Sequence, residues 1–149
     1  MMKPQYFHSI EDALAALFGS GAAIGKAERV FAGDINDSYV LTLMDGHCVF
    51  VKANSREDAA FFAAEAAGLD AIARTGTVGT PQVLGYGADA GRMGRSFLLL
   101  ALVSAGRRRK DYWEMLGQEL ANMHRADTGE YMEGGRYGVF RDNYIGRRD

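Results

Sequence analysis

A lysine and a glutamate are the first residues of this sequence whose types and spacing could do chemistry. Lys52 ends the apolar run "HCVFVK", and Glu65 lies inside the alanine-rich stretch "AAFFAAEAAGLDAI". In a strand, alternate side chains share a face, so Lys52 would share one with Cys48 and Phe50. In a helix, Glu65 would fall on one apolar stripe, which comprises Phe61, Leu69 and Ile72.

A carboxylate on an apolar stripe is costly unless it is paired, and the lysine strand would lie in the adjacent layer. The spacing therefore predicts an ion pair between Lys52 and Glu65. Two interpretations stay open at this point. The pair could be purely structural, or it could hold the lysine so that its ammonium meets a phosphate.

A polar turn, "FAGDINDSYVL", precedes the lysine strand and bears on this choice. Gly33 permits unusual φ angles and a close backbone approach. The turn-forming residues after it could present backbone N–H groups to phosphate oxygens; they are Asp34, Asn36, Asp37 and Ser38. A plain polar hairpin is the alternative, since the turn is neither a G-x-G-x-x-G nor a Walker A sequence. Loop, lysine and glutamate in this order are together typical of a kinase-like nucleotide-binding lobe.

The helices and strands that position these residues are predicted from the spacing of apolar residues and from capping and turn residues. Ser9 with Asp12 resembles a capping box, and Asp45-Gly46 signals a hairpin turn. We expect helices over residues 10–18, 56–75 and 111–126, and strands over 26–33, 37–44, 47–53, 81–87 and 96–103. Three strands joined by short turns favour an antiparallel sheet, and the helix inserted after the third must pack on it. The predicted class is α+β.

Composition indicates which partners and which cellular location fit this sequence. The 149 residues are 48% hydrophobic and 24% charged, with a net charge of -2, which favours neither nucleic acid nor a membrane surface as a partner. No apolar run approaches the roughly 20 residues of a membrane span, and the N-terminus shows no secretory signal. The single cysteine, Cys48, fits a reducing compartment. We expect a cytoplasmic protein.

Several segments together resemble the N-terminal half of the fructosamine kinase family. They are "GDINDSYVLTLMDGHCVFVKAN", "FFAAEAAGLDAIARTGTVGTPQVLGYG", "SFLLLALV", "WEMLGQELANMHR" and "YGVFRDNYIG". The resemblance implies a protein-kinase-like fold related to the aminoglycoside phosphotransferases. Residues 1–103 would then form the nucleotide-binding N-lobe, a sheet of about five antiparallel strands with one packed helix. Residues 104–149 would be the linker and the first helix of an incomplete helical C-lobe.

The resemblance also implies ATP and Mg²⁺ as cofactors and a sugar-amine, or ketosamine, as the substrate of the complete enzyme. By that resemblance, the loop over the phosphates would comprise Gly33, Asp34, Ile35, Asn36, Asp37 and Ser38. Lys52 would contact the phosphates and Glu65 would orient it. Leu98 to Val103 would connect the lobes, and the backbone of Leu100, Ala101 and Leu102 would meet the adenine. Asp142, Asn143 and Tyr144 would border the sugar.

This sequence also departs from the family pattern. It contains no "HGD" motif, so we expect the catalytic-loop aspartate and the metal-binding aspartate of such kinases downstream of Asp149. Ala101 stands where the family commonly has an acidic residue, and "IGRRD" departs from the usual "IGST". We therefore expect a chain that is inactive by itself, with no catalytic or metal-ligating residue. A non-catalytic nucleotide-binding module and a purely structural interaction protein are the alternatives.

Other residues have structural explanations beside functional ones. His124 fits a helix-terminal packing or capping residue, "GRRRK" fits a solvated linker, and Asp142 with Asn143 could fix a loop locally. The helix at 111–126 has an apolar face that a longer C-lobe would cover, comprising Trp113, Leu116, Leu120 and Met123. We expect these residues to be core. Exposed apolar surface of this kind predicts a homodimer or an exchanged helix; the aromatic tail could instead fold back over the face.

Overall fold

The structure, a computed structural model of the 149-residue chain, describes residues 3–30, 36–55, 59–89 and 96–126. Its described elements run β1 (Tyr6–Phe7), α1 (Ile10–Phe18), β2 (Ile24–Val30), β3 (Asp37–Leu43), β4 (Cys48–Asn54), α2 (Ala60–Thr75), β5 (Val83–Ala88), β6 (Ser96–Ala101) and α3 (Tyr112–Arg125). The α+β class is confirmed. None of the described helices is both long and apolar enough to cross a bilayer.

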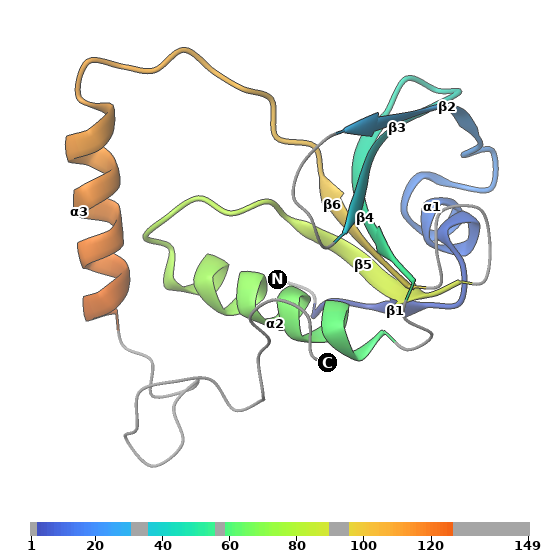
Figure 1. The fold of residues 1–149 in the computed structure, drawn as a ribbon, viewed down its shortest axis with the longest axis horizontal. Coiled ribbons are helices and arrows are strands. Elements are labelled where there is room, and N and C mark those ends of the chain that lie inside the picture. The colour runs from blue at the N-terminus through green and yellow to red at the C-terminus, as the bar shows by residue number, and fades with distance from the viewer. Residues whose placement is uncertain (1–2, 31–35, 56–58, 90–95, 127–149) are drawn as a thin grey trace.

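The strands form one sheet in the order β1-β5-β6-β4-β3-β2 (Figure 1). All neighbours are antiparallel except β1 and β5, which are parallel. The predicted sheet of about five strands thus gains a sixth, because the two residues of β1 are too few to show a period. The predicted first strand, 26–33, begins earlier, at Ile24, and its described part ends at Val30.

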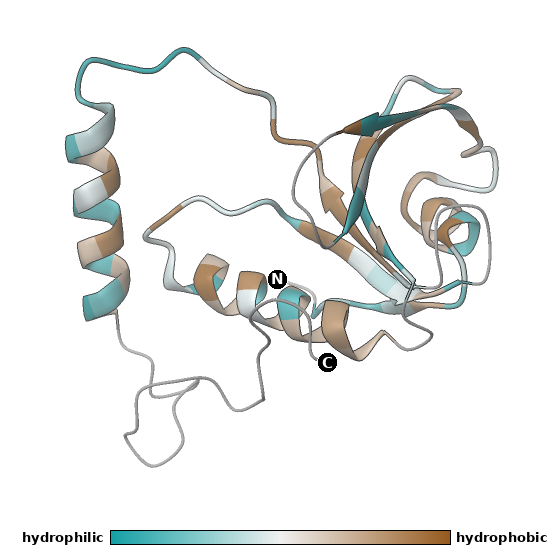
Figure 2. Cartoon of the chain, viewed as in Figure 1, coloured by the Kyte–Doolittle hydropathy of each residue, from teal (hydrophilic) through white to brown (hydrophobic). Residues whose placement is uncertain are grey.

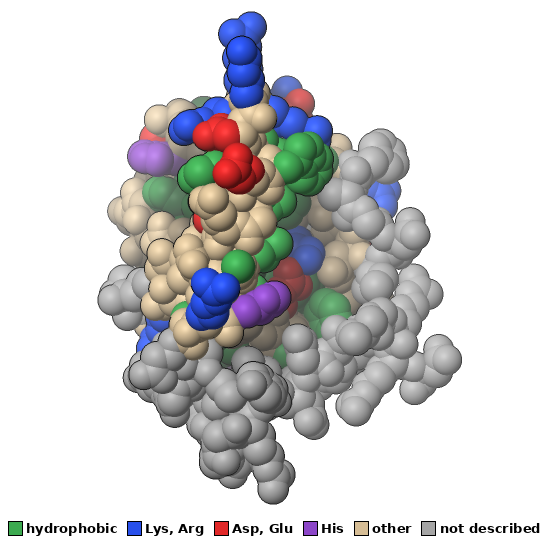
Figure 3. All heavy atoms as spheres, turned by 90° about the vertical axis from the view of Figure 1, so that its left-hand side faces the viewer, with side chains coloured by type: hydrophobic (Ala, Val, Ile, Leu, Met, Phe, Trp, Pro, Cys, Tyr) green, Lys and Arg blue, Asp and Glu red, His purple; other side chains and the backbone are tan. Residues whose placement is uncertain are grey.

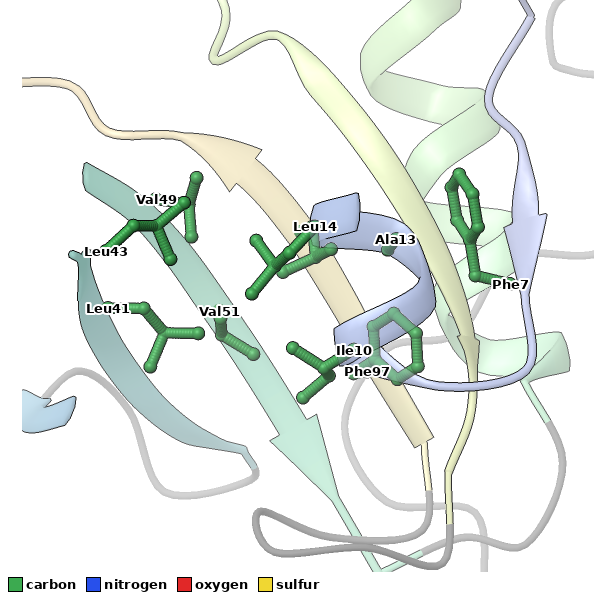
Figure 4. Packing of buried hydrophobic residues seen from close by; sticks show 10 residues of the cluster. Phe7, Ile10, Ala13, Leu14, Leu41, Leu43, Val49, Val51 and Phe97 are labelled. Atoms are coloured by element: carbon green, nitrogen blue, oxygen red, sulfur yellow. The ribbon is translucent and has the colours of Figure 1, made fainter. Parts of the chain in front are cut away.

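Two helices sandwich this sheet, where one was expected. α1 begins as predicted, since the Ser9 side chain accepts a hydrogen bond from the backbone N–H of Asp12 at 3.0 Å. Its apolar side packs on one face of the sheet (Figure 4) in a cluster whose members include Ile10, Ala13, Leu14, Leu41, Leu43, Val49, Val51, Phe97 and Leu99. The opposite face carries Leu98 and Leu100, against which α2 packs Phe62 and Ala66.

The turn between β3 and β4 fixes which β4 side chains face which helix. Gly46 adopts φ 91, a value that favours glycine, as the Asp45-Gly46 pair predicts. The register pairs Ser38 with Lys52 and Val40 with Phe50. Alternation along β4 then gives Val49 and Val51 to the α1 side and Phe50 and Lys52 to the α2 side.

The third helix differs from the other two. α3 stands apart from the sheet at the end of an extended linker (Figure 1), and none of its residues is buried. Trp113, expected in the core, is 69% exposed, and Leu120 is 39% exposed. That expectation was wrong for the described residues, because an amphipathic pattern identifies the apolar side of a helix but not what covers it. Figure 2 shows the mixture of apolar and polar residues along α3.

Candidate functional site

The predicted ion pair between β4 and α2 is confirmed. Lys52 Nζ lies 2.6 Å from Glu65 Oε1, within hydrogen-bond distance. Both side chains are half-buried, 25% and 27% exposed respectively, so water still reaches them. A lysine in this position is held at a defined place on the sheet while its remaining N–H donors stay available to an anion.

Glu65 does not lie on the buried stripe of α2, where it was expected. The residues of α2 that are fully buried on the sheet are Phe62 and Ala66, while Phe61 and Leu69 are only partly buried. The buried stripe is therefore displaced by one residue from the predicted one. Glu65 lies at its border, which explains how a carboxylate fits there without complete desolvation.

A buried hydroxyl lies directly across the ladder from the lysine. Ser38 on β3 pairs with Lys52 on β4, and its side chain therefore shares the α2 face of the sheet. Ser38 is 1% exposed, and its Oγ has no hydrogen-bond partner in the described parts of the chain. An unsatisfied buried hydroxyl costs about 1–3 kcal/mol, so this group is suited to a partner that the described residues do not supply.

Two asparagines complete the polar side of the site. Asn54 Nδ2 donates to Asn36 Oδ1 at 3.1 Å. Asn36 belongs to the predicted phosphate-covering turn, whereas Asn54 was not identified from the sequence. The signal was present, because Asn54 follows Lys52 by two residues and alternation puts both on one face.

The other predicted nucleotide residues divide into three groups. Asp37 forms an ion pair with Arg29 on β2, so its carboxylate is already neutralised by the neighbouring strand. Gly33, Asp34 and Ile35 lie outside the described residues. Leu100, Ala101 and Leu102 form the end of β6 and the start of the linker.

The connection between β6 and α3 has backbone N–H and C=O groups that are not used in strand pairing, beginning where the chain leaves the sheet. Leu100 is buried in the cluster under α2, and the N–H of Ala101 donates to the carbonyl of Gln82 at 2.9 Å. Ala101 is the last residue paired in the ladder with β4. From Leu102 onward the chain leaves the sheet, so its backbone donors and acceptors are not taken up by strand pairing.

Two further predictions concern residues outside the described structure. Asp142, Asn143 and Tyr144 lie outside the described residues, and so does Asp149, beyond which the catalytic and metal-binding aspartates are expected. Within the described ranges, no group of three or more His, Cys, Asp or Glu side chains is arranged to hold a metal ion. The part of the site that can be built is therefore Lys52, Glu65 and Ser38 with the Asn36–Asn54 pair.

Comparison with known proteins gives this arrangement a context. The model of the family described as fructosamine kinase matches residues 6–149. A probable ketoamine kinase of Synechocystis is 34% identical over 144 residues, which are 96% of this chain and 45% of that protein. A chloroplastic protein-ribulosamine 3-kinase of Oryza sativa subsp. japonica is 32% identical over 128 residues, which are 86% of this chain and 35% of that protein.

A solved structure agrees with these sequences. A crystal structure of a protein from Haemophilus somnus, assigned as a fructosamine-3-kinase, superposes with a TM-score of 0.76 at 28% identity, covering 93% of this chain and 44% of the other. This chain thus spans about half the length, or less, of the relatives it matches, and corresponds to their N-terminal part.

Proposed function

The chain belongs to the fructosamine kinase family, and we propose that it forms the ATP-binding N-terminal portion of a phosphotransferase that acts on ketosamines. The observation that carries the proposal is the 2.6 Å pair between Lys52 and Glu65. Strand alternation and helical period predicted this ion pair, and the resemblance to fructosamine kinases implied its roles as phosphate-contacting lysine and orienting carboxylate. Membership of a kinase family favours this role over a purely structural ion pair.

Each described residue receives a separate task in this proposal. The Lys52 ammonium meets the nucleotide phosphates, and Glu65 keeps the long lysine side chain from swinging toward solvent. The buried Ser38 hydroxyl, which lacks a protein partner in the described residues, lies across the ladder from Lys52 and can donate to a phosphate oxygen. The backbone of the connection from Leu100 to Leu102 meets the adenine. ATP would supply the transferred phosphoryl group.

Phosphoryl transfer requires groups beyond the nucleotide-binding residues proposed above. Phosphoryl transfer depends on bound metal and on a residue that orients the acceptor hydroxyl. The "HGD" motif that supplies the catalytic aspartate in such kinases does not occur in the sequence. We therefore propose that the 149-residue chain binds nucleotide but does not transfer phosphate by itself, while Asp142, Asn143 and Tyr144 contribute to a sugar site in the complete enzyme. A non-catalytic nucleotide-binding or interaction module is the alternative.

Calorimetric titration of ATP, with Mg²⁺ present, tests the binding role. We expect Lys52→Ala to weaken ATP binding about tenfold, since a charge-assisted contact is lost, and to leave adenosine binding unchanged. Glu65→Gln should weaken ATP binding less, because the lysine remains but is no longer held. Lys26→Ala is the matched control, since it removes an exposed lysine that pairs with Glu28 on β2.

Two results would contradict the proposal. If ATP does not bind at millimolar concentration, or if Lys26→Ala weakens it as much as Lys52→Ala does, Lys52 is not the phosphate-contacting lysine. Phosphorylation of a ketosamine by the pure 149-residue chain, lost in Lys52→Ala, would show that the chain is catalytically complete after all.

A further inference from the structure

A row of polar side chains crosses the sheet next to the ion pair. Asn54 on β4 pairs with Ser96 on β6, and Asn36, which directly precedes β3, accepts a hydrogen bond from the Asn54 side chain. Asn54 and Ser96 therefore share the face that carries Lys52, and the hydrogen bond to Asn54 brings the Asn36 side chain next to them. Asn54 is 9% exposed and Ser96 is 1% exposed, so these two side chains are buried.

The bond within this row has a direction. Asn54 Nδ2 donates to Asn36 Oδ1 at 3.1 Å, so the oxygen branch of the Asn36 carboxamide is turned toward β4. The two branches of a carboxamide diverge, and the Nδ2 branch of Asn36 is therefore turned away from Asn54. That branch carries two N–H donors and no acceptor, which is the chemistry an anion needs. Asn36 is half-buried, so these donors are partly shielded from water.

We propose that Asn54 is a positioning residue, which orients Asn36 so that Asn36 Nδ2 donates to a phosphate oxygen of the nucleotide held by Lys52. In this proposal Asn54 does not touch the nucleotide and acts on it through Asn36. The inference rests on the proposed nucleotide-binding function and adds to it one phosphate donor and the residue that aims it.

The location supports this arrangement. Asn36 stands two residues before Ser38, whose buried Oγ lies across the ladder from Lys52 and has no partner among the described residues. Asn36 directly precedes β3, and its bond to Asn54 brings its side chain to the face of β4 that carries Lys52. An anion beside the Lys52 ammonium would meet donors from both strands.

Titrations of ATP and adenosine into Asn54→Leu, Asn36→Leu and the double variant test the proposal. Leucine approximates the shape of asparagine but cannot form the bond. We expect each single variant to weaken ATP binding about five- to tenfold and to leave adenosine binding unchanged. The double variant should be no weaker than Asn36→Leu, because residues that act through one contact are not additive.

Ser96→Ala is the matched control. It removes a buried polar atom from the same row, but one that forms no hydrogen bond in the described structure, and it should leave the ratio of ATP to adenosine affinity unchanged. Circular dichroism of each variant before titration verifies that the sheet is intact. If Asn54→Leu does not fold, Asn54→Ser, which keeps a donor with a shorter reach, should fold and show a smaller loss in ATP affinity than Asn36→Leu.

The outcomes separate this inference from the function on which it rests. If the wild-type chain binds ATP through Lys52 but Asn54→Leu binds it equally well, Asn54 is not a positioning residue. Equal losses of ATP and adenosine affinity, or additive effects in the double variant, would also overturn the proposal. If the wild-type chain binds no ATP, the proposed function itself fails.

Discussion

The helix α3 is at least as amphipathic as α1 and α2, yet only the region formed by the sheet with α1 and α2 buries its apolar side chains. Leu14 on α1 and Phe62 on α2 are fully buried, whereas Trp113 on α3 is 69% exposed. Figure 3, which views the molecule from the α3 side, shows hydrophobic side chains on this helix open to the surface. Amphipathicity therefore specifies a face, while a neighbouring layer decides whether that face becomes a core.

The largest test of this contrast compares one aromatic residue from each region. We expect Phe62→Ala to lower the free energy of unfolding by about 3–5 kcal/mol, because it opens a cavity between α2 and the sheet. Trp113→Ala should change it by less than about 0.5 kcal/mol, as for an exposed position. Urea denaturation measures both. Equal losses would mean that Trp113 is packed in solution and that the contrast is wrong.

A second test concerns the parallel edge of the sheet. Gly87 on β5 pairs with Phe7 on β1, and a Cβ at Gly87 would collide with the backbone carbonyl of Phe7. Gly87→Ala should therefore cost about 1–3 kcal/mol, as overpacking does, and should free the N-terminal strand to amide hydrogen exchange. Gly79→Ala is the control, because a Cβ there meets open space. Unchanged exchange in β1 would show that the short strand is not held by this contact.

The exposed face of α3 gives a third prediction. A chain that shows Trp113, Tyr112, Met115 and Leu120 to solvent should associate through them, as expected from the sequence. Leu120→Glu should weaken a homodimer by about 1–2 kcal/mol, the transfer energy of one leucine, whereas Gln118→Glu on another side of the helix should not. Sedimentation equilibrium measures the dimer.

The fluorescence of Trp113 gives an independent measurement of the same association. It is the single tryptophan of the chain, and its emission should shift to shorter wavelength as the concentration rises. A monomer at high concentration with exposed Trp113 would contradict self-association.

The smallest expected effect belongs to the turn between β3 and β4. The backbone N–H of His47, and then its ring, hold the pKa of Asp45 below its usual value of 3.8. A lowered folded-state pKa gives stability that is present above the unfolded pKa and is lost as pH falls through the folded one. Asn at this position should leave thermal stability near pH 7 almost unchanged, since Asp45 is exposed. The small difference between wild type and Asp45→Asn should be largest near pH 7 and vanish below about pH 4. A difference that grows as the pH falls would contradict this.

The sequence was most informative where a local pattern and a chemical requirement agreed. The Lys52–Glu65 pair could be predicted because strand alternation, helix period and the cost of an unpaired carboxylate all required it. The Ser9 cap and the Gly46 turn are likewise local. β1 could not be predicted, since two residues show no alternation and its pairing with β5 depends on glycines distant in sequence.

Two errors came from assuming what packs against a helix. The buried stripe of α2 is centred on Phe62 and Ala66 rather than on Phe61 and Glu65, because two neighbouring stripes of an alanine-rich helix are almost equally apolar. The assignment of Trp113 to a core assumed a layer that the described structure does not place against α3. Asn54 was overlooked because a single asparagine belongs to no recognisable sequence motif. Its position two residues after Lys52 nevertheless predicts that both side chains lie on one face of the strand.

The outermost strand also affects how the protein behaves in a crowded solution. β2 lies at the edge of the sheet, and its residues after Ile24 are all exposed. An open strand edge is a template on which another chain can add, and charges along it oppose that addition. Lys26 and Glu28 pair at 2.8 Å along this edge, and Arg29 pairs with Asp37. These charges on β2 should therefore oppose the addition of a strand from another chain to this edge of the sheet.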